Sequence, residues 1–321
     1  MDVKHQTSLP RGVVIHPDEL GECWLKRLKG SDIHTLGLHP VGGKRADASL
    51  EQLRQDVLSG KMDEAFTALR DMGIQLEYEM HAMSWLLPRQ RFSEHPDWFR
   101  MNEAGERVAE FNLCASSSGA LAFVSDRAAE LSQILRPTTH RYHYWIDDVR
   151  DSFCHCPACR ELSPSDQAMR IYNALLEGIR RVDPFATQCY LAYQKTGAVP
   201  TAVTPDEGIF LEYAPFDRDF HRPLSDVDCE KNQRETAPLS ALLSYFGREN
   251  AKVLEYWLDN SLFSKWKKPP VPFALDTSVM QEDLGYYAQL GFTDVTAFAC
   301  YLGEDYEVLH GVPQIEAYLK K

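Results

Sequence analysis

Two adjacent carboxylates end an aromatic, β-prone run in Tyr142-His-Tyr-Trp-Ile-Asp-Asp148. Strands seldom end in paired acids for packing reasons, because two neighbouring negative charges repel each other and must be held by other groups. The pair therefore indicates a site at one edge of a sheet. Cys154-His-Cys-Pro-Ala-Cys159 follows a few residues later, and we interpret this segment as a clamp that fixes the loop after the strand.

Short β-branched and aromatic runs of this kind occur eight times and are separated by helical patterns. The predicted strands are Gly12–His16, Ile33–His39, Ile74–His81, Tyr142–Asp148, Thr187–Tyr193, Ile209–Tyr213, Val253–Trp257 and Thr293–Phe298. The predicted helices are Asp18–Lys29, Leu50–Met72, Ser165–Val182, Pro238–Arg248, Gln281–Leu290 and Val312–Leu319. Eight strands alternating with helices predict an α/β fold, a single (β/α)8 TIM barrel over residues 1–321. A doubly wound open sheet is the second choice, and the absence of a G-x-G-x-x-G after the first strand counts against it.

One connection is much longer than the usual loop between a strand and a helix. Residues 82–140 follow the third strand and contain several prolines and tryptophans. We expect a folded insertion in this place, with a helix near Ala120–Leu135. No internal repeat, low-complexity tract or linker divides the chain, so the sequence predicts one domain.

Composition limits the class of protein. The chain has 321 residues, of which 44% are hydrophobic and 25% charged, as in soluble globular proteins. A net charge of -13 argues against nucleic acid or an anionic membrane as a partner. Met1-Asp-Val-Lys-His-Gln lacks a secretory signal pattern, and clustered thiols suit a reducing compartment, so we expect a cytoplasmic protein. A homo-oligomer is compatible with these features.

Polar side chains accumulate where the predicted strands end, which is the end at which barrel enzymes form their active sites. Alternation along a strand sorts these residues by face. Glu79 and His81 share one face of the third strand, and Glu255, Trp257 and Asp259 share one face of the seventh. Because an apolar face packs against the surrounding helices, we expect these polar faces to point into the barrel.

Carboxylates and aromatic rings around a concave mouth are typical of a carbohydrate site, and cleavage of a glycosidic bond needs a proton donor and a second stabilising group. We assign Asp148 as general acid/base and Asp147 as the orienting or stabilising carboxylate, with Glu212 or Glu255 as reserve partner. Two alternatives are open: strand-end aspartates often cap the following turn, and Glu255 can be an ion-paired core acid. The predicted substrate-binding residues are His39, Glu79, His81, Trp85, Tyr213, Arg218, Trp257, Asp259 and Tyr301. No organic cofactor is expected.

Three thiolates within six residues can bind one zinc ion, because C-x-x-C is a common chelating turn. Cys154, Cys156 and Cys159 supply them, and Cys114 in the insertion is the first candidate for the fourth ligand. Such a zinc ion would be structural and would tie the loop after the fourth strand to the insertion. The alternative is a set of reduced cysteines packed without metal.

Several of these segments also resemble a known family. Its motifs are similar to His95-Pro-Asp-Trp-Phe99, Asn112-Leu-Cys114, Trp145-Ile-Asp-Asp148, Cys154-x-Cys-x-x-Cys159 and Leu162-Ser-Pro-Ser-Asp-Gln167. The chain resembles, from about His39 to Tyr301, an uncharacterised bacterial family of barrel proteins, the domain of unknown function 4838. That family is related to glycoside hydrolases of the alpha-glucuronidase and hexosaminidase types. The resemblance implies a barrel and carbohydrate chemistry without naming a substrate.

The aspartate pair is also similar to the Asp-Asp or Asp-Glu pair of N-acetylhexosaminidases. This likeness implies that Asp147 orients an acetamido group and that Asp148 is the acid/base. The leading hypothesis is therefore an exo-acting glycoside hydrolase with a substrate-assisted mechanism on a small sugar terminus. Alternatives are a glucuronidase- or sialidase-like enzyme that clamps an acidic sugar with Arg89, Arg91 or Arg218, a non-catalytic carbohydrate-binding barrel, and a zinc-dependent hydrolase.

Overall fold

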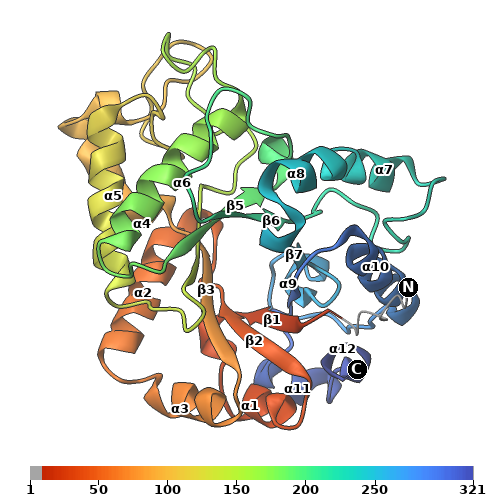
Figure 1. The fold of residues 1–321 in the computed structure, drawn as a ribbon. Coiled ribbons are helices and arrows are strands. Elements are labelled where there is room, and N and C mark those ends of the chain that lie inside the picture. Colours follow the sequence, from red (N-terminus) through yellow and green to blue (C-terminus); the bar gives the residue numbers. More distant parts are fainter. Residues whose placement is uncertain (1–8, 321) are drawn as a thin grey trace. The chain divides into compact units, whose positions relative to one another are not determined.

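A computed structural model describes residues 9–320, so Met1–Gln6, in which no signal pattern is predicted, lies outside the described residues. The eight strands pair in chain order and close into a barrel (Figure 1), which confirms the predicted (β/α)8 fold. The first and last strands close it in parallel, with Val13 opposite Ala297. The strands are β1 (Arg11–Ile15), β2 (Ile33–Leu38), β3 (Gln75–His81), β4 (Arg141–Trp145), β5 (Thr187–Ala192), β6 (Ile209–Tyr213), β7 (Ala251–Glu255) and β8 (Val295–Phe298).

Helices follow most of the strands, as expected for this fold. They are α1 (Glu22–Leu28), α2 (Ala46–Leu58), α3 (Asp63–Asp71), α4 (Met83–Leu86), α5 (Ser118–Ser132), α6 (Pro164–Arg180), α7 (Glu230–Thr236), α8 (Leu239–Phe246), α9 (Asn260–Phe263), α10 (Thr277–Leu290), α11 (Glu304–His310) and α12 (Glu316–Leu319). Short 3-10 helices are η1 (Pro17–Glu19), η2 (Gly43–Arg45), η3 (Arg89–Ser93), η4 (Pro96–Trp98), η5 (Gln194–Thr196) and η6 (Arg248–Asn250). Within residues 9–320, no helix combines the length and the apolar character that a membrane crossing requires.

The strands form because their residues can be buried on both faces of a parallel sheet. All five residues of β1, β6 and β7 are buried, including polar ones. Continuous apolar runs such as Val13–Ile15 are typical of strands covered by helices on one face and by the barrel interior on the other. The sequence signal for these strands is therefore strong, but it does not say which side chains point inward.

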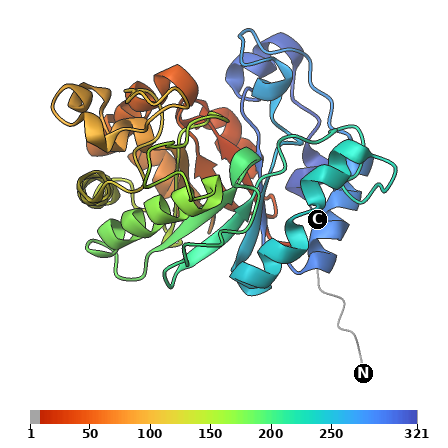
Figure 2. The same cartoon turned by 90° about the horizontal axis from the view of Figure 1, so that it is seen from above.

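Contacts group the chain into two compact units. One comprises the described residues up to Gly37, Ala65–Leu76 and the chain from Leu211 onward, and the other comprises Leu38–Glu64 and Glu77–Phe210. In the second unit α5 and α6 lie side by side (Figures 1 and 2). They approach closely at Gly178, where an added Cβ would lie 1.9 Å from the carbonyl oxygen of Ser125.

Several predicted boundaries need correction. The predicted helix Leu50–Met72 is two helices, because α2 ends at Leu58 and Gly60 takes a left-handed φ of 77° before α3 begins. The predicted helix Val312–Leu319 is helical only over Glu316–Leu319, and α1 begins at Glu22 after the 3-10 turn η1. Strand β4 ends at Trp145, three residues before Asp148. The predicted helix near Ala120–Leu135 is confirmed as α5.

Candidate functional site

Three aromatic side chains meet where β2, β3 and β4 end in the second unit. His39 follows β2, His81 ends β3 and Trp145 ends β4, and the Trp145 ring lies 5.6 Å from the His39 ring and 5.1 Å from the His81 ring. Each histidine places Nδ1 2.7 Å from a backbone carbonyl oxygen, that of Glu79 for His39 and that of Ile146 for His81. A carbonyl oxygen can only accept, so Nδ1 carries a proton in both rings.

Buried acids lie along β3 below these rings. Glu77 and Glu79 are fully buried, and Glu77 accepts a hydrogen bond of 2.7 Å from Arg141 and lies 3.3 Å from His143. Both partners are on β4, the neighbouring strand. Buried carboxylates require such partners, so Glu77 is held by the sheet itself.

The two predicted catalytic acids follow β4 and are held by different elements. Asp147 Oδ2 accepts a hydrogen bond of 2.7 Å from Arg89, which also donates to the carbonyl of Phe111. The backbone N–H of Asp147 donates to Asn112 Oδ1 at 2.8 Å. Asp148 is exposed, and its Oδ1 accepts a hydrogen bond of 3.0 Å from the Tyr193 hydroxyl. The insertion therefore holds Asp147, and the segment after β5 contacts Asp148.

A small concavity, open to solvent, lies beside this pair. Its lining includes His81, Asp147, Arg150, Tyr193 and Lys195. Gln194 also lines it and has a φ of 49°. Left-handed backbone is uncommon for a residue with a side chain and is enriched at functional sites. The pocket thus combines carboxylate, imidazole, phenol and two cations at one rim.

Two predicted site residues lie instead in a buried ion cluster of the first unit. Arg218 Nη1 lies 2.8 Å from Glu255 Oε1 and 2.7 Å from Asp283 Oδ2, and the Tyr287 hydroxyl donates to Glu255. All four side chains are buried. Desolvation raises the pKa of Glu255 to about 7, against the lowering effect of the Arg218 charge.

This cluster corrects the predicted orientation of strand seven. Asp283 and Tyr287 belong to α10, so Glu255 points toward this helix and not into the barrel. Trp257 follows it in the same direction, because its Nε1 donates to Asp283 at 2.9 Å. The expectation of an inward polar face was wrong because β7 is buried on both faces, where alternation does not distinguish inside from outside.

The other predicted residues have contacts that stabilise the fold. Glu212 is buried 3.4 Å from Lys252, and Tyr213 donates a hydrogen bond to the Glu235 carbonyl. Trp85 donates to Glu51 and lies under the Arg127 guanidinium. Asp259 caps α9 through the Ser261 N–H, and Tyr301 packs against His16 and Lys268. Of the predicted binding residues, His81 lines the pocket with Asp147, and the His39 ring lies 6.0 Å from the His81 ring. The backbone carbonyl of Glu79 is bonded to His39, while its side chain groups with Glu77 and His143.

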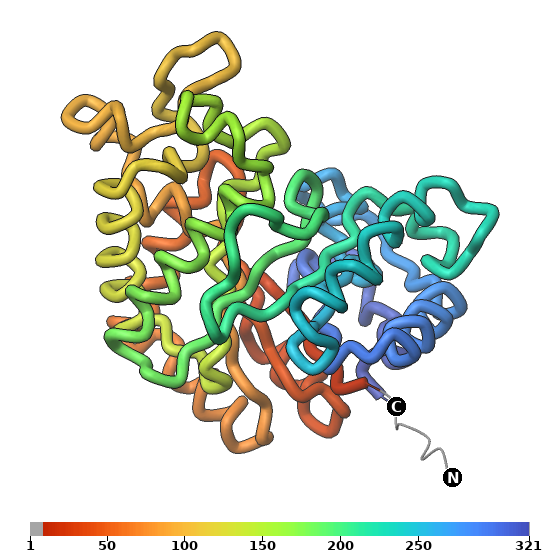
Figure 3. The backbone as a smooth tube through the Cα atoms, turned by 45° about the horizontal axis from the view of Figure 1, so that its top comes forward, coloured from red at the N-terminus to blue at the C-terminus, as the bar shows by residue number. Residues whose placement is uncertain are grey.

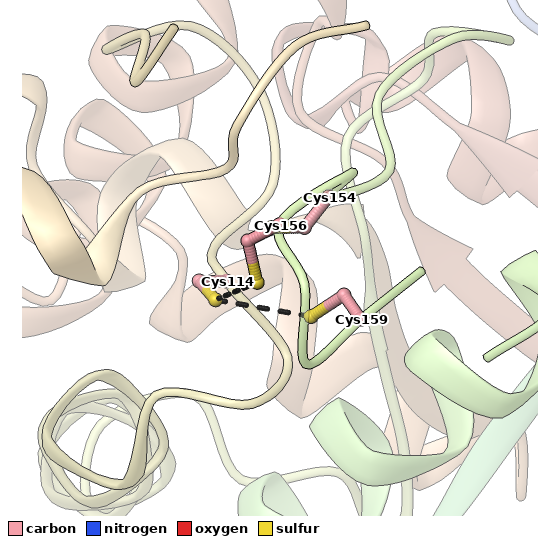
Figure 4. Close-up of side chains that lie close together, drawn as sticks. All are labelled: Cys114, Cys154, Cys156 and Cys159. Carbon is pink, nitrogen blue, oxygen red and sulfur yellow. Dashed lines mark hydrogen bonds between the residues drawn. The ribbon is translucent and has the colours of Figure 1, made fainter. Parts of the chain in front are cut away.

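The four predicted cysteine ligands come together (Figure 4). Cys114 Sγ lies 3.7 Å from Cys156 Sγ and 3.8 Å from Cys159 Sγ, and the sulfurs of these residues and Cys154 all lie within 4.8 Å of one another. These separations are too long for disulfides. Hydrogen bonds from the Cys154 and Cys159 thiols lower the pKa of Cys114 below its usual value. All four side chains are buried.

Sequence reasoning missed several groups around the aspartate pair. The sequence assigns no role to Asn112, Arg150 or Tyr193, and it indicates Arg89 only as a clamp for an acidic sugar. A signal for Asn112 exists, because it stands two residues before Cys114 in the motif Asn112-Leu-Cys114. For Arg150 and Tyr193 the useful signal is only their position just after a predicted strand.

The closed barrel and its polar rim define a (β/α)8-barrel protein. Residues 52–300 match the family model described as Domain of unknown function (DUF4838), and the chain belongs to this family. No curated protein matches the chain significantly.

Several solved glycosidase structures align with this chain. An alpha-galactosidase from Thermus thermophilus is 12% identical with a TM-score of 0.46, and the alignment covers 90% of this chain and 61% of that one. An endoglucanase from Pseudomonas stutzeri is 14% identical with a TM-score of 0.47, covering 91% and 85%. A xyloglucanase from Bacteroides ovatus is 13% identical with a TM-score of 0.48, covering 97% and 73%. None of these TM-scores reaches 0.5, so they do not bear on the chemistry of the site.

Proposed function

We propose that this protein is a glycoside hydrolase whose site lies at the ends of β3, β4 and β5 in the second unit. One observation carries the proposal: Asp147 lines a solvent-open pocket together with His81 and Tyr193, and Tyr193 also binds the adjacent Asp148. Imidazole and carboxylate groups bind sugar hydroxyls, and a phenol ring can stack on the apolar face of a sugar. We propose a small sugar terminus as the substrate.

The two acids differ in a way that separates their roles. Asp147 is fixed by Arg89 and by its own backbone bond to Asn112, which suits a carboxylate that orients a substrate group. Asp148 is exposed and accepts a hydrogen bond from the Tyr193 hydroxyl, which suits a group that exchanges protons with substrate and water.

In the proposed substrate-assisted reaction, Asp148 donates a proton to the glycosidic oxygen as the bond to the anomeric carbon breaks. The carbonyl oxygen of a substrate acetamido group bonds to that carbon, while Asp147 accepts a hydrogen bond from the acetamido N–H. Water then attacks the anomeric carbon, the bond from that carbon to the acetamido oxygen breaks, and a proton from the water returns to Asp148. His39 and His81 would bind hydroxyl groups of the ring.

A panel of nitrophenyl glycosides tests this proposal on the purified protein. We expect turnover of at least one sugar, and a fall of roughly 10²- to 10⁴-fold in kcat for Asp148→Asn, the range for loss of a general acid. Asp151→Asn is the matched control, because Asp151 is an exposed aspartate on the same loop. Full activity of Asp148→Asn would remove its role, and sugar binding without turnover would favour the non-catalytic barrel.

A second candidate is a hydrolase for acidic sugars, and a specific observation favours it. Arg150 and Lys195 both line the pocket, in a chain whose net charge is -13. Two cations at an otherwise polar rim could pair with the carboxylate of a glucuronate or sialate. The clamp would then come from these residues and not from Arg218, which is buried in its own ion cluster.

Replacement of Lys195 separates the two candidates. If the substrate is acidic, Lys195→Met should raise KM for a glucuronide at least tenfold and leave the kinetics on neutral sugars unchanged, because only the acidic sugar loses an ion pair. Lys267→Met, an exposed lysine outside the pocket, is the control. Equal effects on neutral and acidic sugars would count against the acidic-sugar candidate.

A further inference from the structure

The cysteine cluster has the dimensions of a metal site. Zinc–sulfur bonds are about 2.3 Å long, which gives a tetrahedron with sulfurs about 3.8 Å apart. The Cys114 sulfur lies 3.7 and 3.8 Å from those of Cys156 and Cys159. Four unlinked thiols from two separate segments converge at this spacing, and a central cation accounts for their convergence.

The surroundings favour a bound cation with four thiolate ligands. The N–H of Met101 donates to Cys154 Sγ at 3.3 Å, and Arg107 Nη1 lies 3.7 Å from the same sulfur. Such donors stabilise the excess negative charge that remains when four thiolates bind one Zn²⁺. Since all four ligands come from the protein and are buried, no coordination position is open to a substrate, and the site is of the structural type.

The cluster also joins the two segments that hold Asp147. Cys114 belongs to the insertion, and Cys154, Cys156 and Cys159 belong to the loop after β4. Figure 3 shows these two stretches of chain running beside each other, and the His155 N–H donates to the Met101 carbonyl at 2.8 Å. A metal ion here would cross-link two segments that are also joined by hydrogen bonds such as this one and by the contact between His155 and Glu103.

A short hydrogen-bond chain leads from the cysteines to the aspartate. Asn112 lies two residues before Cys114 and accepts from the Asp147 N–H at 2.8 Å. Its Nδ2 donates at 2.8 Å to Ser152 Oγ, which lies two residues before Cys154. The hydrogen bond between Asn112 and Ser152 therefore joins the segment that carries Cys114 to the segment that carries Cys154.

We propose that Cys114, Cys154, Cys156 and Cys159 bind one structural Zn²⁺ ion that positions Asp147 through Asn112. The cysteines of this site are positioning residues, because they touch neither the pocket nor any reacting group. The metal site does not depend on the proposed hydrolysis, and its test needs no substrate.

Elemental analysis of the protein, purified under reducing conditions, tests for the metal. We expect about one zinc per chain, loss of that zinc in Cys156→Ser, and retention in Cys229→Ser, a buried cysteine outside the cluster. Because Cys156→Ser could fail to fold, cobalt substitution of the unmodified protein gives a second readout. It should produce the visible absorption of tetrahedral thiolate coordination. Absence of zinc from the folded, reduced protein would overturn the proposal, and iron in its place would overturn the choice of metal.

Hydrogen exchange of the unmodified protein, with and without a zinc chelator, tests the positioning role. Removal of zinc should speed amide exchange in residues 111–115 and 146–156 by at least tenfold, while the amides of β1 and β8 keep their rates. Unchanged exchange at residues 146–149 after complete loss of zinc would show that the metal does not position Asp147.

Discussion

Arg218 illustrates how a side chain's partners decide what it can do. It lies between Glu255 and Asp283 in the first unit, and all three side chains are buried. Removing the cation leaves two carboxylates facing each other without compensation. We therefore expect Arg218→Met to lower the free energy of unfolding by about 3–5 kcal/mol in urea denaturation.

The control for this prediction is Arg91→Met. Arg91 pairs with Glu94 at 2.9 Å on the surface, where an ion pair contributes about 1 kcal/mol or less. A similarly small loss in the free energy of unfolding for both variants would mean that the buried cluster tolerates an unpaired charge. That result would contradict the structural role of Arg218.

The role of a residue could be predicted where it follows from nearby residues in the sequence. The spacing of Cys154, Cys156 and Cys159 identified a cluster, and the structure brings Cys114 to it. Glu255 was not predictable in the same way, because its partners come from a distant loop and from α10. In a strand that is buried on both faces, the alternation of side chains does not show whether Glu255 points to the barrel interior or to the helices.

At the scale of elements, the contact between α5 and α6 depends on a missing side chain. Gly178 of α6 faces the Ser125 backbone of α5, and a Cβ there would lie 1.9 Å from the carbonyl oxygen. Gly178→Ala should force the helices apart and lower the melting temperature, with a loss of about 1–3 kcal/mol from overpacking.

Gly285→Ala is the same chemical change, but we expect it to stabilise the protein. Gly285 lies in α10, and no atom lies within 4 Å of an added Cβ. Alanine there should raise stability by about 0.5–1 kcal/mol through its better helix propensity. If both variants were stabilised, the α5–α6 contact would be looser than described.

Helices and strands could be predicted where a run of residues is buried. Their ends were harder to predict where the backbone conformation of one residue sets the boundary. All eight strands were found because apolar and aromatic runs are strong signals. The break between α2 and α3 was missed, because Gly60 within Leu50–Met72 can be either helical or left-handed. The two acids were placed inside a strand that ends at Trp145, although the turn held by Asn112 carries them.

At the scale of the whole molecule, Glu19 makes stability depend on pH. It follows β1, and its two oxygens accept from the N–H groups of His16 at 3.2 Å and of Gly303 at 3.1 Å. Desolvation nevertheless raises the pKa of Glu19 from 4.5 to about 8. The folded protein therefore binds this proton more tightly than the unfolded chain does.

The stabilisation from this proton is complete below pH 4.5 and is lost as pH rises toward about 8. Between these limits the free energy of unfolding should fall by up to about 1.4 kcal/mol per pH unit relative to Glu19→Gln. Urea denaturation from pH 5 to 8 measures this difference. Glu22→Gln, at an exposed position nearby, should follow the original protein, and a Glu19→Gln curve parallel to it would contradict the expected coupling.

Closure of the barrel has a consequence for self-association. Each of the eight strands in the described chain has a neighbour on both sides, so the sheet has no row of unsatisfied N–H and C=O groups at an edge. Addition of a foreign strand, the usual route to fibrils and to edge-paired dimers, would first require two of its own strands to separate. Copies of this chain that meet in solution must therefore recognise each other through side chains of helices and loops.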